Sequence, residues 1–436
     1  MAEHTAEQTS WTEPPADYPA AIRAVKRRLR AQIGDVDALF ARIEDRLRPK
    51  VEEVVALKER GEAVWPVVQF SDIAAGTVPA ETVDLIHRRG CAVVRGQVPA
   101  EQALGWDASL VEYLDRNDFA GVYRGPADDF FGTLEASAPE IYPIYWSAAQ
   151  MEARQHENTA KVQSFLNAMW KSESRGVTWF DPDQDSMYPD RIRRRPPGAT
   201  SGGLSGHTDS GSVERWLTPA YQQVFAPLFD GDVDAYDPWD AAYRTEVDEY
   251  PSSTMCSVFR SFQGWLAMSE MQHDQGVLWT VPIPEAMAYI IVRPLLSDVP
   301  EDSLCGAEQG MALGVHEEWH PLLTRATVGI PTVQPGDSVW WHSDLVHGVA
   351  PVQDQKGWGN VIYIPAAPMC AKNAAYAADV AERFRRGESP RDFPEEHYEA
   401  SWEDRFRESD LNEVGRRGLG VQRGASAPAR AAQARA

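Results

Sequence analysis

The sequence predicts an α+β protein whose core is a jelly roll or a cupin-like barrel, with helical additions at both ends. Two observations predict this fold class. Near both ends of the chain, apolar residues recur at three- and four-residue steps, which is the period of an amphipathic helix. Between them, short strand-like runs are separated by glycine and proline, as in folds built from many short strands.

A polar leader (1–19) precedes the first helical pattern, which covers residues 20–60. Its apolar positions follow the helix period at Ile22, Val25, Leu29, Ile33, Leu39, Ile43, Leu47, Val51 and Val55. Because the other positions are mostly polar, we expect surface helices that pack on a larger body.

Residues 78–114 combine helix and strand signals. The pattern predicts a helix that stops at Gly90, a short buried strand over 91–94, a turn at Gly96 and a second helix. Residues 20–115 therefore form an α+β entry into a sheet.

The part of the chain from 140 to 372 is predicted to carry the barrel. Residues 140–171 are interpreted as an aromatic-rich helix and 180–206 as a polar loop rich in arginine and glycine. The strand-like runs that follow are SVFRSFQGWLAM, GVLWTVPI, AYIIVRPLL, TVQPGDSVWWH and NVIYIPAA. Two segments near 214–250 and 297–325 are interpreted as insertions, and we expect both outside the barrel.

The C-terminal part is predicted to be helical and charged over 373–415. The last residues, 419–436, have too little apolar content to pack. We expect one domain over 20–415, between a flexible leader and a disordered tail.

The composition points to small-molecule partners. The formal net charge of −23, from 42 basic and 65 acidic residues, argues against nucleic acid or an anionic membrane surface as the main partner. The four cysteines are far apart and form no CxxC pair, so neither a disulfide framework nor a zinc ribbon is indicated. With no long apolar run and no signal peptide, we expect a cytoplasmic protein, of unknown oligomeric state.

One pair of residues has the spacing of metal ligands. In LSGHTDSGS, His207 and Asp209 are two residues apart, and in an extended segment this spacing points both side chains to one face. A remote histidine would complete a 2-His-1-carboxylate triad, which leaves one face of an octahedral Fe(II) open. His347 is the best candidate, because QPGDSVWWHSDLVHGVAPV gives a turn, an aromatic strand and then a histidine followed by glycine.

Other pairs share the same spacing. They are His342 with Asp344, His316 with Glu318, and His397 with Glu399. His342 and Asp344 lie so close to His347 in sequence that three ligands from one short stretch would be crowded. We therefore interpret His342 as a core histidine or as a group that orients a ligand.

The motifs RRGCAVVRGQVP, GHTDSGS, FQGWLAMSEM, GVLWTVPIP and PGDSVWWHSDLVHGVAP occur in a characteristic order. With them the chain resembles, over roughly residues 20 to 415, the Fe(II)/2-oxoglutarate-dependent dioxygenases of the phytanoyl-CoA hydroxylase-like clan. More narrowly, it resembles a branch catalogued as a domain of unknown function, whose fungal members are often labelled gibberellin-desaturase-like.

This resemblance implies a double-stranded β-helix core, with the HTD sequence on the loop after an early strand and His347 near a late one. It also implies Fe(II), 2-oxoglutarate and O2 as cofactor and cosubstrates. The reaction would hydroxylate or desaturate a C–H bond and release succinate and CO2. Related halogenases replace the carboxylate with a small residue, so Asp209 argues against halogenation.

The chain departs from the resemblance in one respect. Most relatives hold the far carboxylate of 2-oxoglutarate with an arginine shortly after the distal histidine. Here GVAPVQDQKGWGNVIYIP offers only Lys356, with Asn360 beyond it. Arg260 in FRSFQGW is our first candidate for this anchor and Arg293 in AYIIVRPLL the second. Either could instead be a structural arginine paired with a carboxylate.

Two segments are predicted to surround the open face of the iron and to contact the substrate there. These are the expected helix with Tyr142, Tyr145 and Trp146, and the loop YPDRIRRRPPG with Arg191 and Arg193. An arginine-rich entrance suggests an anionic small molecule. The plainer interpretation is that the aromatic residues are core and that the arginines lie on a solvated loop.

Two other functions stay open at the level of sequence. A cupin-type metal-dependent oxygenase or isomerase would use the same fold and triad without 2-oxoglutarate, and the missing late arginine keeps this alternative open. A barrel kept as a ligand-binding module is the non-enzymatic alternative, and the intact triad residues argue against it.

Overall fold

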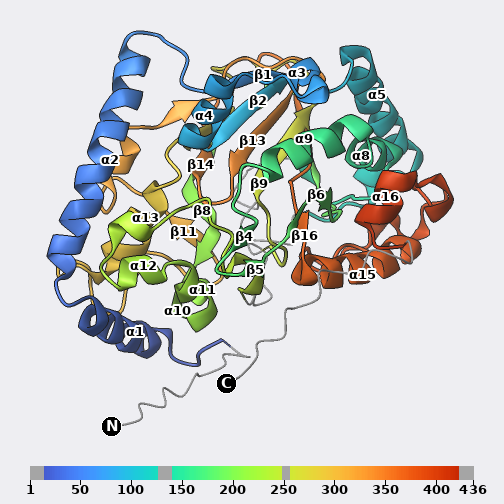
Figure 1. Ribbon diagram of the computed structural model, residues 1–436. Coiled ribbons are helices and arrows are strands. Elements are labelled where there is room, and N and C mark those ends of the chain that lie inside the picture. The colour runs from blue at the N-terminus through green and yellow to red at the C-terminus, as the bar shows by residue number, and fades with distance from the viewer. Residues whose placement is uncertain (1–13, 126–139, 248–255, 422–436) are drawn as a thin grey trace.

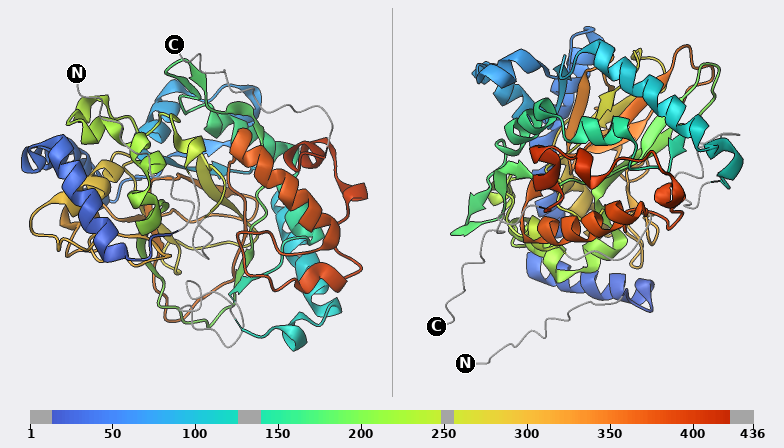
Figure 2. Two further views of the ribbon diagram at one scale, coloured as in Figure 1. Left: turned by 90° about the horizontal axis from the view of Figure 1, so that it is seen from below. Right: turned by 90° about the vertical axis from the view of Figure 1, so that its right-hand side faces the viewer.

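The computed structural model describes residues 14–125, 140–247 and 256–421 (Figure 1). The protein has a mixed α/β structure with several sheets, and helices surround the larger sheets in the further views (Figure 2). Residues 1–13 of the predicted leader and 422–436 of the predicted tail lie outside the described residues. In the part of the chain that is described, none of the helices is long and apolar enough to cross a membrane.

The larger sheet has seven strands in the order β1-β2-β13-β9-β15-β7-β3. Its strands are β1 (Val67–Gln69), β2 (Cys91–Arg95), β13 (Ser338–His342), β9 (Phe262–Ala267), β15 (Gly359–Tyr363), β7 (Ile192–Arg195) and β3 (Ile141–Tyr142). Strands β1 and β2 pair in parallel, and the other neighbours pair antiparallel.

The second sheet has five antiparallel strands in the order β11-β8-β14-β10-β12. They are β11 (Ala312–Gly314), β8 (Leu204–Ser212), β14 (Val346–Val349), β10 (Leu278–Val281) and β12 (Val328–Gly329). Two small ribbons pair β6 (Asp181–Asp185) with β16 (Pro368–Met369) and β4 (Glu173–Ser174) with β5 (Val177–Thr178).

The two larger sheets share a buried layer. Trp265, Val339, Trp341 and Val361 of the seven-stranded sheet pack in one cluster with Leu278 of the five-stranded sheet. Side chains alternate along a strand, so the neighbouring residues face the other way. The outer face of the seven-stranded sheet therefore carries Ile192, Leu266, Trp340 and Ile362, which cluster with Leu110 and Leu166 of two helices.

Helices cover the outer faces of both sheets (Figure 1). Over the five-stranded sheet, α1 (Tyr18–Ile33), α2 (Val36–Glu59) and α13 (Ala286–Val292) pack in one cluster with Val281 and Val346. The other helices are α3 (Phe70–Ala75), α4 (Ala80–Arg89), α5 (Ala100–Arg116), α6 (Phe119–Val122), α8 (Ala148–Arg154), α9 (Glu157–Asn167), α10 (Val213–Leu217), α11 (Pro219–Val224), α12 (Ala226–Phe229), α14 (Pro321–Thr324), α15 (Ala371–Arg386) and α16 (Glu413–Gly418).

The predicted elements of the N-terminal part are confirmed. Helix α4 ends at Gly90, whose φ is 66°, and strand β2 ends before Gly96, whose φ is 63°. Both glycines adopt the left-handed backbone that other residues avoid. The helical patterns near the two ends of the chain correspond to α1, α2, α15 and α16. The predicted tail begins too early, because Leu419 is fully buried.

Three predicted elements are wrong. The run AYIIVRPLL is helix α13 followed by a 3-10 turn over Arg293–Leu295, and it is not a strand. Residues 140–171 form β3, an extended segment and the two helices α8 and α9. The polar loop predicted over 180–206 contains strands β6 and β7, and the arginines of β7 are buried.

The predicted insertions are more integrated than expected. The segment near 297–325 contributes strand β11, which pairs with β8 inside the five-stranded sheet. The segment near 214–250 forms α10 to α12, and its Arg244 reaches a buried carboxylate at Asp344. Residues 248–250 of that segment lie outside the described residues.

Glu399 connects the C-terminal region to the segment before α8. Its buried carboxylate accepts hydrogen bonds from Tyr113 Oη at 2.7 Å and Trp146 N at 2.9 Å. Burial raises the pKa of Glu399 from 4.5 to about 7. The folded protein therefore holds this proton more tightly than the unfolded chain. This contribution to stability is complete below pH 4.5 and is lost as the pH rises to about 7.

We expect the free energy of unfolding to fall between pH 4.5 and pH 7, with Glu399 contributing up to roughly 3 kcal/mol. Urea denaturation across this range would measure the slope. In Glu399→Gln the slope should be smaller, whereas the exposed Glu403→Gln should keep it. An equal slope in all three proteins would contradict this assignment.

Candidate metal centre

Two adjacent strands bring the predicted ligands together. Strands β8 and β14 pair antiparallel with His207 directly opposite His347. His207 and Asp209 alternate onto the same face of β8, so the HTD sequence lies within a strand and not on the predicted loop. A Cβ at Gly206 would lie 2.7 Å from the Trp279 ring, and one at Gly348 would lie 2.5 Å from it. The two glycines therefore let Trp279 pack against both strands beside the ligands.

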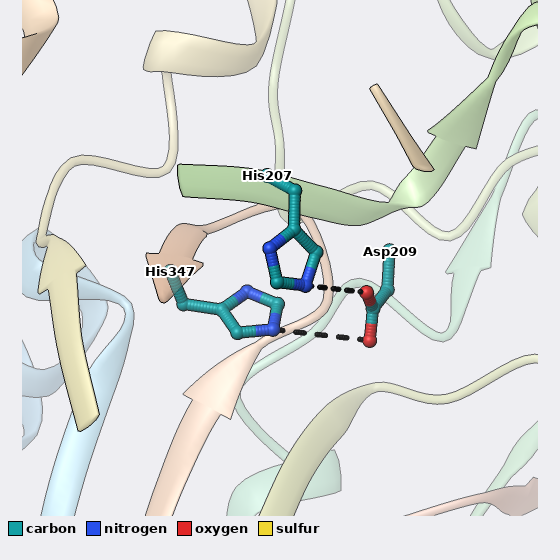
Figure 3. Close-up of side chains that lie close together, drawn as sticks. All are labelled: His207, Asp209 and His347. Carbon is teal, nitrogen blue, oxygen red and sulfur yellow. Dashed lines mark ion pairs between the residues drawn. The ribbon is translucent and has the colours of Figure 1, made fainter. Parts of the chain in front are cut away.

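The three side chains point toward one another (Figure 3). His207 Nε2 lies 3.2 Å from Asp209 Oδ1, and His347 Nε2 lies 3.8 Å from Asp209 Oδ2. One ligand atom from each residue lies within 4.8 Å of the other two. His207 and His347 are buried, with 6% of each exposed, so water cannot replace an absent partner freely.

The hydrogen bonds of the two rings fix which nitrogen is available. His207 Nδ1 lies 2.8 Å from Ser205 O, and His347 Nδ1 lies 3.0 Å from Leu345 O. A carbonyl oxygen only accepts, so each Nδ1 carries a proton. In a neutral imidazole this leaves the lone pair on Nε2, the atom of each ring that lies near the Asp209 carboxylate. Burial would lower the pKa of His207, but its hydrogen bond to Asp209 and the charge of that carboxylate raise it. A metal ion between the three groups would take the place of the proton on this Nε2.

The charges of the site also suit a metal. Burial and the nearby His207 lower the pKa of His347 to about 4, so this ring is neutral at physiological pH. Burial would raise the pKa of Asp209, but His347, His207 and Arg260 together hold it well below its usual range. A neutral imidazole and an ionised carboxylate are the forms that bind metal ions.

Three further residues surround the triad. Arg260 Nη2 donates to Asp209 Oδ2 at 3.4 Å. With its amide oriented to satisfy both neighbours, Gln263 donates to Asp209 Oδ2 at 2.6 Å and accepts from Trp341 Nε1 at 3.2 Å. The Trp341 ring lies 5.3 Å from the His347 ring. Neither Gln263 nor Trp341 was predicted as a site residue, although a glutamine inside the aromatic run FQGW indicates a buried polar contact.

A small cavity of about 50 Å³ adjoins Asp209. It carries more basic than acidic side chains, which suits an anionic ligand. Its lining consists of Asp209, Ser210, Arg215, Tyr221, Val224, Arg244, Val247, Cys256, Val258, Phe259, Arg260, Ser343 and Lys372. Arg260 is thus the predicted anchor that the structure brings beside the triad.

The other predicted anchors lie elsewhere, so these three predictions are wrong. Arg293 follows α13 and forms a bidentate pair with Asp298 at 2.7 and 2.6 Å. Lys356 is exposed and pairs with Asp354. Asn360 faces outward from β15, where its side chain donates to Asp107 of α5 at 3.0 Å.

The residues predicted to meet the substrate separate into two groups. Tyr142 lies in β3, and Tyr145 and Trp146 lie in the extended segment before α8, so none of them is on the predicted helix. Both backbone N–H groups of Tyr145 and Trp146 donate to Glu399, which indicates a structural role for this segment.

The arginines predicted on a loop are part of the fold. Arg191 is buried directly before β7 and lies over the Phe393 ring at 4.8 Å. Arg193 is a buried residue of β7. Neither arginine is on a solvated loop.

His342 is a core histidine. Its ring stacks on Trp170 at 4.4 Å, and its Nε2 lies 3.1 Å from Pro238 O. Asp344, its neighbour in the rival pair, accepts two hydrogen bonds from Arg244 at 2.9 and 2.7 Å. Both oxygens of this carboxylate accept from the Arg244 guanidinium, so the structure does not favour His342 and Asp344 as metal ligands.

Comparisons with known proteins place most of the chain in one family. A family model described as Gig2-like matches residues 16–421. The uncharacterized protein YbiU of Escherichia coli K12 is 60% identical over 409 residues, which cover 93% of this chain and 97% of YbiU.

Solved structures show the same fold. A crystal structure from Salmonella typhimurium LT2, bearing the name "Putative Oxidoreductase", has a TM-score of 0.90 at 58% identity and covers 93% of this chain and 98% of that one. The structure of GlcNAc Inducible Gene 2, GIG2 (DUF1479), from Candida albicans has a TM-score of 0.79 at 26% identity and covers 96% and 92%.

Proposed function

The chain belongs to the Gig2-like family, and we propose that it is a mononuclear non-haem Fe(II) oxygenase that uses 2-oxoglutarate and O2. The observation that carries this proposal is the arrangement of His207, Asp209 and His347, whose three ligand atoms lie within 4.8 Å of one another. Two imidazole nitrogens and one carboxylate oxygen are the donor set of the 2-His-1-carboxylate oxygenases.

The arrangement of the sheets supports the same proposal. In the seven-stranded sheet β7, β15, β9 and β13 are neighbours, and in the five-stranded sheet β8, β14, β10 and β12 are neighbours. We interpret these two sets as the facing sheets of a double-stranded β-helix. In such a fold an early strand and a late strand lie side by side, as β8 and β14 do.

The protein's residues would hold and orient the reacting groups. His207, Asp209 and His347 would bind the iron on one side, and Gln263 would keep Asp209 in position. Bound Fe(II) supplies the chemistry in which 2-oxoglutarate and O2 become succinate and CO2 while a substrate C–H bond is hydroxylated or desaturated. Trp341 packs beside His347.

Arg260, which the sequence suggested as the anchor of the far carboxylate, is instead our proposal for binding the cosubstrate at the metal. Its guanidinium contacts the metal ligand Asp209, so the carboxylate it can reach is one that lies at the metal. Cosubstrate binding at the open face also leaves the basic cavity beside Asp209 for a small anionic substrate.

Succinate formation tests the proposed function. The Fe(II)-loaded protein should convert 2-oxoglutarate to succinate and CO2 in air, slowly without a substrate and faster with one. A cupin-type oxygenase or isomerase would form no succinate, and this result would refute the use of 2-oxoglutarate.

Replacing Arg260 by glutamine should weaken 2-oxoglutarate binding by roughly 10-fold, because one charged hydrogen-bonding partner is lost. Pyruvate shares the 2-oxo acid end, so its binding should weaken equally. Both effects can be measured by anaerobic titration of the Fe(II) protein. Arg293→Gln is the matched control and should change neither affinity; an unchanged affinity in Arg260→Gln would exclude Arg260 as a cosubstrate ligand.

A further inference from the structure

The inner layer between the sheets contains a guanidinium without a carboxylate partner. Arg193 of β7 is 7% exposed. It donates to Gly359 O at 3.3 Å and to the Met271 sulfur at 3.5 Å, and within the described residues no carboxylate pairs with it. A buried cation without an anion is costly to keep, so the site is one where an anionic ligand would be stabilising.

The neighbouring arginines show that this is particular to Arg193. Arg194 points to the outer face and pairs with Asp107 at 3.1 Å. Arg195 pairs with Glu140, also at 3.1 Å. Burial and the nearby charge of Arg195 lower the pKa of Arg193, and the opposing effects of Tyr363 and Glu140 do not cancel this.

Gly359 lies between the guanidinium and a second buried polar side chain. A Cβ at this position would lie 3.8 Å from Arg193 Nη2 and 3.6 Å from Gln355 Nε2, which is ordinary contact. Gln355 is 2% exposed, and its amide Nε2 can donate to a carboxylate, as the guanidinium can. Two buried donors therefore lie beside one glycine.

The strand register places this group on the same interior face as the metal centre. Along β9, residues 263, 265 and 267 alternate onto one face, and Gln263 contacts Asp209. Ala267 pairs with Val361, and Val361 pairs with Arg193. From residue 263 to 267 the strand advances about 13 Å. An extended arginine and a metal-bound five-carbon diacid can together fill that span.

We propose that Arg193, with Gln355, binds the far carboxylate of the 2-oxoglutarate that chelates the metal. This inference rests on the proposed function, and it assigns the anchor that the sequence lacks after His347. Strand β15 is the strand that follows His347 in the chain, and β7 pairs with it. Arg193 therefore enters the interior from the strand next to β15. Arg260 then serves the carboxylate at the metal, and Arg193 the one at the other end.

The two assignments differ in what they recognise. Pyruvate chelates a metal as 2-oxoglutarate does but lacks the far carboxylate. Arg193 should therefore discriminate between the two acids, whereas Arg260 should bind both. Glutarate has two carboxylates and no oxo group, so it tests carboxylate recognition without chelation.

Anaerobic titration of the Fe(II)-loaded full chain with 2-oxoglutarate and with pyruvate tests the proposal. In Arg193→Met the Kd for 2-oxoglutarate should rise by about 10- to 100-fold, whereas the Kd for pyruvate should change by less than about twofold. Arg193→Lys should give an intermediate rise. Arg194→Met, one residue away on the outer face, is the matched control and should change neither Kd.

Thermal unfolding of the metal-free protein gives a second readout. Glutarate should raise the Tm of the wild type and of Arg194→Met but not that of Arg193→Met. If the wild type stays spectroscopically silent with 2-oxoglutarate and glutarate still shows this pattern, the carboxylate site stands and the proposed function fails. Equal weakening of 2-oxoglutarate and pyruvate in Arg193→Met, or no change in either readout, would overturn the proposal.

Discussion

Replacing Asp209 by alanine will abolish retention of iron. The carboxylate is the one anionic ligand of the triad, and both imidazole Nε2 atoms face it. Without it, two neutral nitrogens remain, and we expect the affinity for Fe(II) to fall by more than about 100-fold. The measurement is the iron content per chain after anaerobic loading and desalting, with one equivalent expected for the wild type.

The control for this experiment is Asp344→Asn. Asp344 is hydrogen-bonded to Arg244 and takes no part in the triad, so this variant should retain iron wherever it folds. If Asp344→Asn lost iron and Asp209→Ala retained it, the result would indicate that the metal binds at His342 and Asp344 instead.

Asp344→Asn has a different and equally large expected effect, which is on stability. Arg244 and Asp344 are both buried, with 7% and 1% exposed, and they form two hydrogen bonds. Removing the carboxylate charge leaves the Arg244 guanidinium buried without an anion. We expect the free energy of unfolding to fall by about 3 to 5 kcal/mol.

Chemical denaturation measures this loss, and two further variants sharpen it. Asp298→Asn removes the partner of Arg293, but 62% of the Asp298 side chain is exposed, so we expect less than about 1 kcal/mol. The double variant Arg244→Met/Asp344→Leu removes both charges and should recover part of the loss. A loss below about 1 kcal/mol in Asp344→Asn would show that water or another group compensates Arg244.

The N-terminal elements could be predicted from the sequence because their ends carry local signals. Gly90 and Gly96 take left-handed backbone angles that end a helix and a strand, and these requirements do not depend on distant residues. The run AYIIVRPLL has no such signal. A short, continuously apolar segment fits a buried helix as well as a buried strand, and packing against α2 decides for the helix.

The arginines of β7 show that a run of charged residues does not by itself predict an exposed loop. The run IRRR lies in the segment that was predicted to be a polar loop, yet Arg194 and Arg195 pair with Asp107 and Glu140 from distant parts of the chain. Pairing partners that are 87 and 55 residues away cannot be read from a local pattern. For the same reason, only the structure shows that Arg193, within the described residues, has no carboxylate partner.

The closeness of His207 and Asp209 could be predicted because a spacing of two residues in a strand points both side chains to one face. Spacing left several rival pairs, and the carboxylates of two of them, Asp344 and Glu399, have other hydrogen-bond partners in the structure. Gln263 has no spacing signal, since its contact with Asp209 depends on how β9 lies relative to β8. The convergence of His207, Asp209 and His347 could therefore be predicted, but the contact of Gln263 with Asp209 could not.

The most direct test of the proposed function is the visible absorption spectrum of the Fe(II) protein under anaerobic conditions. Adding 2-oxoglutarate should produce a weak metal-to-ligand charge-transfer band in the wild type, and the band should be absent in Asp209→Ala. A wild-type protein that binds one equivalent of Fe(II) but shows no band at saturating 2-oxoglutarate would contradict the assignment as a 2-oxoglutarate-dependent oxygenase.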